Sequence, residues 1–198
     1  MKITVASVAC GPPEILHAFS SSLRRLHRPS LSIEYLVIDD NPDPRSSTLL
    51  AEFASETGAE VLTSPCRASA RHCDVAGPTS SRASSIRVGR LQDRLVERAL
   101  ERDCDAVLFV DADLGLDPRT LVVLAAVDLD IVAEVFWTRW CTNSPATAPE
   151  LPNEWEAERY SFVPPAFAAS ADALDAMDLE FLDRLRVPGV HPVGGLAG

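Results

Sequence analysis

Two aspartates stand two positions apart at the end of an apolar run, in the stretch LFVDADLGLDP at residues 108–118. Asp111 and Asp113 can together hold a hard divalent cation such as Mg²⁺ or Mn²⁺, because these ions prefer oxygen ligands and keep open positions that a diphosphate can fill. The alternative is a plain turn in which the aspartates bond the following backbone. The spacing alone favours the turn, so the place of the pair in the fold has to decide.

Two other apolar runs end in residues that could take part in chemistry. The first, KITVASVA, ends at Ala9 and leads into Cys10, and the second, LSIEYLVI, is followed by Asp39 and Asp40. In sheets built from alternating strands and helices, ligands bind beyond the carboxyl ends of the strands. We therefore expect these residues and the Asp-x-Asp pair to converge on one cleft.

The elements that must position these residues follow from the hydrophobic pattern. Predicted strands cover 2–9, 31–38, 59–63, 106–110 and 131–138, and predicted helices cover 14–27, a segment from Ser46 as N-cap to Gly58, 85–102, 118–126 and 171–185. The fourth strand is continuously apolar, as expected of the buried centre of a sheet. The alternation predicts an α/β fold with a mostly parallel sheet that is covered on both faces.

Two stretches lack such a pattern. Residues 64–85 are rich in Ser, Arg, Pro, Cys and Gly and predict a long, mobile loop, and the chain is irregular from about residue 139. A chain of 198 residues is long enough for one domain with a substantial core. We therefore expect a single domain over residues 1–198.

The composition excludes several classes of function. The formal net charge is −11, whereas non-specific binding to nucleic acid or to an acidic membrane needs an excess of basic residues. Lys2 is the only lysine, which excludes a Gly-Lys-Ser/Thr phosphate loop. No apolar run approaches the ~20 residues that span a bilayer, and the start lacks a secretion signal. The five cysteines, without a Cys-x-x-Cys pair, predict reduced thiols in a cytoplasmic protein.

The ordered combination of these segments resembles a known family. KITVASVACGPPE, IEYLVIDDNPDPRSS and LQDRLVERALERDCDAVLFVDADLGLDPRTLVVL look like the nucleotide-sugar-binding half of a GT-A fold glycosyltransferase of the family 2 type. DIVAEVFWTRW and LPNEW are similar to the segment after the Asp-x-Asp motif in a bacterial subset of these enzymes, so the likeness covers roughly residues 2–160. It implies a Rossmann-like, three-layer α/β/α fold with the Asp-x-Asp at the end of the fourth strand. The end of the first strand, at Ala9 and Cys10, then opens the nucleotide site.

The resemblance implies transfer of a sugar from a UDP-, GDP- or dTDP-linked donor to an unknown acceptor, with Mn²⁺ or Mg²⁺ as cofactor. One member of the pair Asp39 and Asp40 accepts a hydrogen bond from the nucleobase of the donor, and we favour Asp40. Arg87 matches an arginine that approaches the base or the phosphates. Asp111 and Asp113 match the metal motif, with Asp113 as the direct ligand and Asp111 as a ribose or outer contact.

Four residues beyond the motif are candidates for contact with the sugar or the acceptor: Trp137, Arg139, Trp140 and Trp155. Trp137 closes a predicted strand, and core packing is the more frequent fate of such a tryptophan. Trp140 and Trp155 stand in polar surroundings and are better candidates to stack on a sugar, although exposed aromatic residues also serve protein interfaces. Arg139 could steady a phosphate.

The sequence does not identify the catalytic base. In the resembled family the base lies downstream of a Gly-Gly-rich loop, and this chain stops at PVGGLAG, residues 192–198, which looks like the beginning of that loop. We therefore expect a truncated acceptor side. Glu150, Glu154 and Glu156 are weak candidates for the base, because acidic loop residues are usually solvated, and His191 is a weak candidate for a third metal ligand. The oligomeric state stays open, a homo-oligomer included.

Other classes of protein fit less well. A nucleotidyltransferase would usually have a Gly-rich phosphate loop with a basic residue after the first strand, whereas CGPPE has one glycine and an acid. A phosphatase of the haloacid dehalogenase type carries Asp-x-Asp on its first strand, not its fourth. The remaining alternative is a truncated or degenerate transferase domain that binds nucleotide or a partner without catalysis, and the missing base keeps it open.

Overall fold

The computed structural model describes residues 1–65, 82–138, 151–152, 154–155, 176–193 and 195–196. The chain divides into two compact units: the first comprises Met1–Val75 and Thr79–Ala126, and the second comprises Ala76–Pro78 and Val127–Gly198. Each unit is described by itself. That the two units belong to one domain, as the sequence predicts, stays a prediction.

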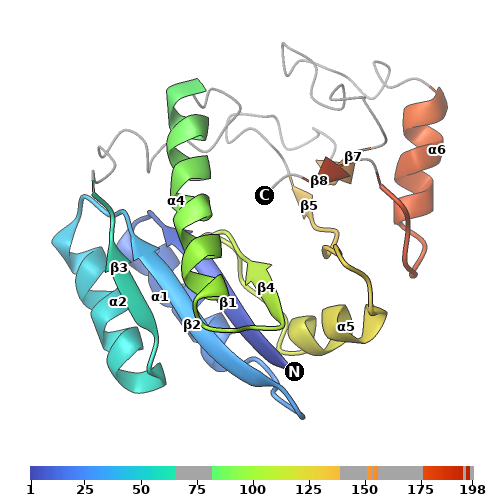
Figure 1. Ribbon diagram of the computed structural model, residues 1–198. Coiled ribbons are helices and arrows are strands. Elements are labelled where there is room, and N and C mark those ends of the chain that lie inside the picture. The colour runs from blue at the N-terminus through green and yellow to red at the C-terminus, as the bar shows by residue number, and fades with distance from the viewer. Residues whose placement is uncertain (66–81, 139–150, 153, 156–175, 194, 197–198) are drawn as a thin grey trace. The chain divides into compact units, whose positions relative to one another are not determined.

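The first unit alternates strands and helices (Figure 1). Its elements are β1 (Lys2–Ala9), α1 (Pro13–Arg24), β2 (Ser32–Asp39), α2 (Pro44–Thr57), β3 (Glu60–Thr63), α4 (Arg82–Leu100), β4 (Ala106–Phe109) and α5 (Thr120–Val127). The four strands form one sheet in the order β3-β2-β1-β4, and all three pairings are parallel. The predicted α/β fold with a parallel sheet is therefore confirmed.

Helices cover both faces of this sheet, with α4 on one side and α1 and α2 on the other (Figure 1). Successive side chains of a strand point to opposite faces. Ile3 and Val5 of β1 accordingly belong to one hydrophobic core, with residues of α1 and α2. Ala6 belongs to a second core, with Leu91 and Leu95 of α4. These two cores give the three-layer α/β/α arrangement that the sequence predicts.

In the part of the chain that the structure describes, β4 is an edge strand and β1 and β2 are the central ones. Residues 106–108 are half-buried, and Phe109 is 43% exposed. The prediction that the fourth strand forms the buried centre is thus wrong for this sheet, because an apolar run does not reveal which strands lie beside it.

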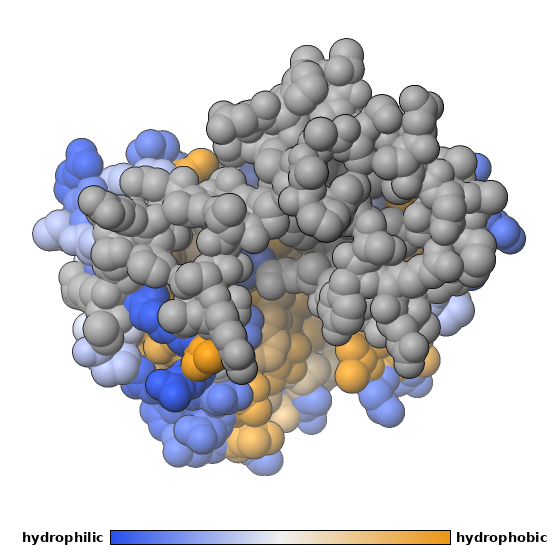
Figure 2. Space-filling model, turned by 90° about the horizontal axis from the view of Figure 1, so that it is seen from above, coloured by the Kyte–Doolittle hydropathy of each residue, from blue (hydrophilic) through white to orange (hydrophobic). Residues whose placement is uncertain are grey.

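On the face of the molecule shown in Figure 2, hydrophobic residues gather in a band next to hydrophilic ones.

The helix α2 begins earlier than predicted. Its N-cap is Asp43, whose Oδ1 accepts a hydrogen bond from the backbone N of Arg45 at 2.9 Å, and Pro44 takes the first helical position. Ser46 is buried within the first turn, and its Oγ donates to the carbonyl of Gly11 at 2.9 Å. The prediction of Ser46 as N-cap is wrong, because aspartate caps equally well and proline is favoured just inside a helix start.

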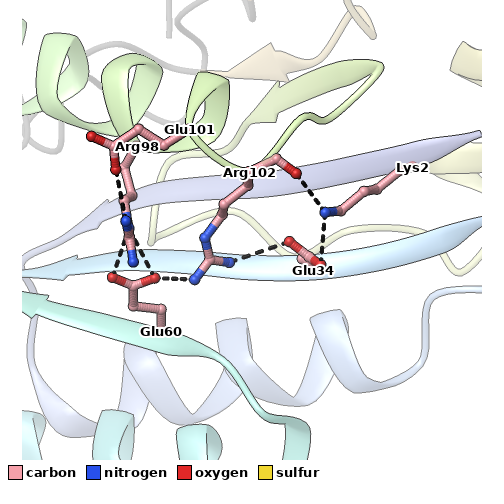
Figure 3. Close-up of polar contacts among 6 residues, drawn as sticks. All are labelled: Lys2, Glu34, Glu60, Arg98, Glu101 and Arg102. Carbon is pink, nitrogen blue, oxygen red and sulfur yellow. Dashed lines mark hydrogen bonds and ion pairs between the residues drawn. The ribbon is translucent and has the colours of Figure 1, made fainter.

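An ion-pair network joins the end of α4 to the first residues of the strands (Figure 3). Arg98 lies 3.0 Å from a carboxylate oxygen of Glu60, and Arg102 pairs with both Glu60 and, at 3.3 Å, Glu34. Lys2 lies 3.1 Å from Glu34 and donates to the carbonyl of Arg102 at 2.6 Å. Desolvation raises the pKa of Glu60, but Arg98 and Arg102 outweigh it, so that the pKa is lowered. The network fixes the position of α4 along the sheet.

The second unit contains short strands and one helix in its described part. β5 (Trp137–Thr138) pairs with β6 (Leu151–Pro152), β7 (Glu154–Trp155) pairs with β8 (Gly195–Leu196), and α6 spans Ala176–Leu185. The predicted strand over 131–138 is wrong for residues 131–136, which are irregular; Ile131 is 80% exposed, so this apolar residue does not pack in a sheet. Of the predicted helix over 171–185, residues 171–175 lie outside the described part.

The helices of the described part do not include one with the length and apolar character needed to span a membrane.

Candidate functional site

The carboxyl ends of β1, β2 and β4 lie at one edge of the sheet, since the three strands are parallel and adjacent. The pairing of β1 with β2 continues to the last residues, where the backbone N of Asp40 donates to the carbonyl of Ala9 at 3.0 Å. On the other side, the N of Val110 donates to the carbonyl of Ala6 at 3.0 Å. The residues that come after these strands therefore leave the sheet at the same edge.

Asp39 and Asp40 are both buried, at 5% and 2% exposure, but they have different partners. Oδ1 of Asp39 accepts hydrogen bonds from Nδ2 of Asn41 at 2.7 Å and from the backbone N of Asn41 at 3.1 Å. Asp40 instead pairs with the guanidinium of Arg87, near the start of α4. Because a buried carboxylate needs a charged or hydrogen-bonding partner, this ion pair couples the end of β2 to α4.

Asp111 and Asp113 follow β4 as exposed residues, and Ala112 between them is buried. Within the described part of the chain, neither carboxylate has a side-chain partner. Although Asp111 as a residue is exposed, partial desolvation of its carboxyl raises the pKa of Asp111, and the charge of Asp113 adds to the shift. A divalent cation would offset this repulsion between two oxygen donors, so the pair fits Mg²⁺ or Mn²⁺.

A third protein ligand is not evident. Among the described residues, no group of three or more His, Cys, Asp or Glu side chains is placed to hold a metal ion. Two carboxylates alone would leave most coordination positions open to water and phosphate oxygens, as is common for Mg²⁺.

Cys10 comes directly after Ala9. Ala9 is completely buried, and Cys10 is half-buried. Cys10 is disulfide-bonded, whereas Cys104 is a free thiol. The prediction of reduced thiols is therefore wrong for Cys10. The spacing of cysteines along a sequence does not show which of them meet in space, and a disulfide depends on that proximity.

Asn41 is a buried residue that the sequence interpretation missed. Its side chain is 0% exposed and bonds the turn after β1, with Nδ2 donating to the carbonyl of Ala9 at 3.0 Å. Oδ1 accepts from the backbone N of Gly11 at 2.9 Å. The signal that could have revealed it is the residue type at a strand end, because asparagine often bonds neighbouring backbone in turns.

The start of α1 offers few groups that could bind phosphate. Pro12 is the N-cap and Pro13 the first helical residue, and proline has no N–H to donate. The N–H of Gly11 is already bonded to Asn41. A phosphate loop depends on free backbone N–H groups at a helix N-terminus, so this turn is unlike the one that a nucleotidyltransferase would need.

The predicted sugar or acceptor contacts belong to the second unit. Trp137 packs in a small core with Phe181 and Leu185, and the guanidinium of Arg186 lies 4.8 Å from the centroid of its ring. Trp155 lies in β7, whereas Arg139 and Trp140 fall outside the described residues. The roles of these four residues stay predictions.

The weak candidates for a base and a third metal ligand are only partly described. Glu154 lies in β7, and Glu150 and Glu156 are outside the described residues. The Nε2 atom of His191 lies 2.7 Å from the carbonyl of Val187, within a local turn. The predicted loop over 64–85 falls mostly outside the described residues as well.

No protein-family model matches the sequence, and no curated protein matches it at a significant level. Solved structures that match include S. aureus TarS, with 22% identity and a TM-score of 0.43 over 64% of this chain and 19% of that one. TarS 1–349 matches with 19% identity and a TM-score of 0.41, as does its complex with UDP-GlcNAc, over 64% of this chain and 32% and 30% of those chains. The match thus spans a third or less of each TarS chain. At this identity and TM-score, the likeness says nothing about the residues of a site.

Proposed function

We propose that this chain binds a nucleoside diphosphate sugar at the carboxyl edge of its parallel sheet and transfers the sugar to an acceptor. The observation that carries the proposal is the meeting, at one sheet edge, of the buried Asp40–Arg87 pair and the carboxylates of Asp111 and Asp113, which pair with no described side chain. Such an edge is where open α/β sheets bind their ligands.

The two groups have complementary roles. Asp40 accepts a hydrogen bond from the nucleobase, and Arg87 donates to the nucleobase or to a phosphate. Asp111 and Asp113 hold Mn²⁺ or Mg²⁺, which when bound neutralises the negative charge of the diphosphate. The acidic chain needs this local positive charge, because its formal net charge of −11 would otherwise repel a diphosphate.

In the transfer, the bond between the anomeric carbon and the diphosphate oxygen breaks while the acceptor oxygen bonds to that carbon. The electron pair of the broken bond leaves with the diphosphate, and the acceptor hydroxyl gives up its proton. Fixed charges at the site lower the barrier by stabilising the separating charge. We assign no residue as the base that takes the proton.

Calorimetric titration of the chain with UDP, GDP and dTDP, each with and without Mn²⁺, tests the donor site. We expect one nucleotide to bind in a Mn²⁺-dependent manner, and D113A to weaken that binding at least about tenfold because a direct metal ligand is lost. The control is D93A, which removes the same charge from an exposed position of α4 and should bind as the native chain does. Binding that is independent of Mn²⁺, or no binding at all, contradicts the proposal.

Nucleotide binding without transfer is a second candidate function, favoured by the lack of an assigned base among the described residues. Incubation of the chain with the sugar conjugate of the bound nucleotide distinguishes the two. Release of free sugar and nucleoside diphosphate, lost in D113A and kept in D93A, supports a transferase. Binding with no turnover supports the non-catalytic alternative.

A further inference from the structure

We infer that Asn41 is a positioning residue of the nucleotide site: its side chain holds the turn after β1 against the end of β2, and thereby sets where Asp40 and the first-strand turn stand relative to each other. This role depends on the proposed function, because it concerns the same nucleotide site. Asn41 itself is 0% exposed and is not presented to a ligand.

The amide of Asn41 is engaged at both ends. Nδ2 donates to the carbonyl of Ala9 at 3.0 Å and to Oδ1 of Asp39 at 2.7 Å, so both of its hydrogens are used. Oδ1 accepts from the N of Gly11 at 2.9 Å. Because a backbone N–H can only donate and a carbonyl can only accept, these partners determine which way the amide faces.

The turn that Asn41 holds is bonded on both sides of Cys10, whose disulfide is a further support. The N–H of Gly11 is bonded by Asn41, and its carbonyl accepts from Oγ of Ser46 at 2.9 Å. The carbonyl of Ala9 accepts from Asn41 and from the backbone N of Asp40. Asn41 in the β2–α2 connection and Ser46 in the first turn of α2 thus hold the backbone on both sides of Cys10.

Asparagine is the side chain that fits this position. Aspartate has no N–H to donate and would place a second carboxylate beside the buried Asp39, which costs free energy. Serine is too short to reach the carbonyl of Ala9 and the N–H of Gly11 together. Serine would leave the N–H of the buried Gly11 without its partner, and the turn would then have to move to find water, whereas the carbonyl of Ala9 keeps its bond from the backbone N of Asp40.

Such a movement of the turn would act on the part of the site that binds the nucleobase. Asp40 directly precedes Asn41 in the chain, and its carboxylate pairs with Arg87. Asp111 and Asp113 follow a different strand, and none of the bonds of Asn41 to described residues reaches them. A displacement of about 1 Å at a binding group is enough to reduce function strongly, so the effect should be large on nucleotide and small on metal with pyrophosphate.

The test compares two ligands on the full chain by calorimetry: the nucleotide among UDP, GDP and dTDP that the native chain binds with Mn²⁺, and inorganic pyrophosphate with Mn²⁺. N41S should weaken nucleotide binding roughly tenfold, as the loss of a supporting hydrogen bond does in metal sites, and should change pyrophosphate binding less than about twofold. The control is F53L, which disturbs the buried core of α2 and should leave both affinities unchanged.

Unchanged nucleotide binding in N41S, or an equal loss for both ligands, overturns the positioning role while leaving the donor site intact. Absence of nucleotide binding in the native chain overturns the donor site and this role together. If N41S does not fold, S46A serves instead, because it removes the other side-chain bond to Gly11 and keeps Asn41. S46A should weaken nucleotide binding about threefold, again without a matching change for pyrophosphate.

Discussion

Single residues at the sheet edge differ in burial and partners more than in type. Asp40 is 2% exposed and paired with Arg87, whose side chain is 27% exposed. The pair therefore has one partner in the interior and one that reaches solvent. A ligand that engages Arg87 must replace some of this contact.

Replacement of Arg87 by alanine should destabilise the protein. R87A leaves the buried Asp40 carboxylate without its cation, and the expected loss is about 2 kcal/mol of unfolding free energy, below the usual cost for a fully buried pair because Arg87 is part-exposed. Urea unfolding followed by circular dichroism measures it. The control R90A removes an exposed arginine of the same helix and should change stability by less than about 0.5 kcal/mol. Equal stability of R87A and R90A would show that the ion pair contributes nothing.

At this scale the sequence indicates candidate positions, and the structure gives the partners of their side chains. Asp39 and Asp40 are equivalent in the sequence, and only the side-chain partners distinguish them: Asp39 bonds Asn41, and Asp40 bonds Arg87. The bonds of Asn41 and the disulfide at Cys10 do not follow from the sequence, because both depend on contacts that form only in the fold.

Among the elements, α4 connects the two ends of the sheet. Arg87, Leu91, Leu95 and Arg98 recur at three- and four-residue intervals, so they lie on one side of the helix, and Arg102 lies in the turn that follows its end. Leu91 and Leu95 pack in the core, while Arg87 pairs with Asp40 just after β2 and Arg98 pairs with Glu60 of β3. The position of Arg87 at the site is thus set partly at the far end of the helix.

Removal of the Glu60 charge should therefore weaken the attachment of α4 in a pH-dependent manner (Figure 3). The pKa of Glu60 is lowered in the folded protein from its ordinary 4.5, so its charge stabilises the fold above that pH, and the contribution disappears as the pH falls through the lowered value. E60Q should lose about 1 kcal/mol at pH 7, a value discounted for solvent screening.

Urea unfolding at pH 7 and at successively lower pH measures this difference between E60Q and the native chain. The control is E97Q, an exposed position on α4, which should match the native chain at every pH. A loss of stability in E60Q that stays constant as the pH falls below 4.5 would attribute the effect to side-chain packing and not to charge.

The elements themselves are largely predictable, because they depend on local patterns. β1 and the end of α2 at Gly58, which adopts a φ of 75°, match the sequence prediction. The errors arise where two residues can serve as the same cap, or where a strand requires a neighbouring strand to pair with. Asp43 and not Ser46 is the N-cap of α2, and residues 131–136 form no strand despite their apolar character.

For the whole molecule, the division into two units makes a prediction about folding. Both hydrophobic cores of the sheet are formed by residues up to position 126, and so are the candidate nucleotide and metal residues. The fragment 1–126 should therefore unfold cooperatively in urea and bind the same nucleotide with Mn²⁺ as the full chain. A fragment that lacks a cooperative transition would show that the second unit is needed to fold the first.

The sequence by itself determined the order of strands and helices and the positions of the acidic strand ends, because hydrophobic period and turn residues act over a few neighbouring positions. Only the tertiary structure decided that β4 is an edge strand in the described sheet, that Asp40 pairs with Arg87, and that Asn41 holds the turn after β1. These features join residues dozens of positions apart, and their energies exist only once the sheet has brought the strand ends together.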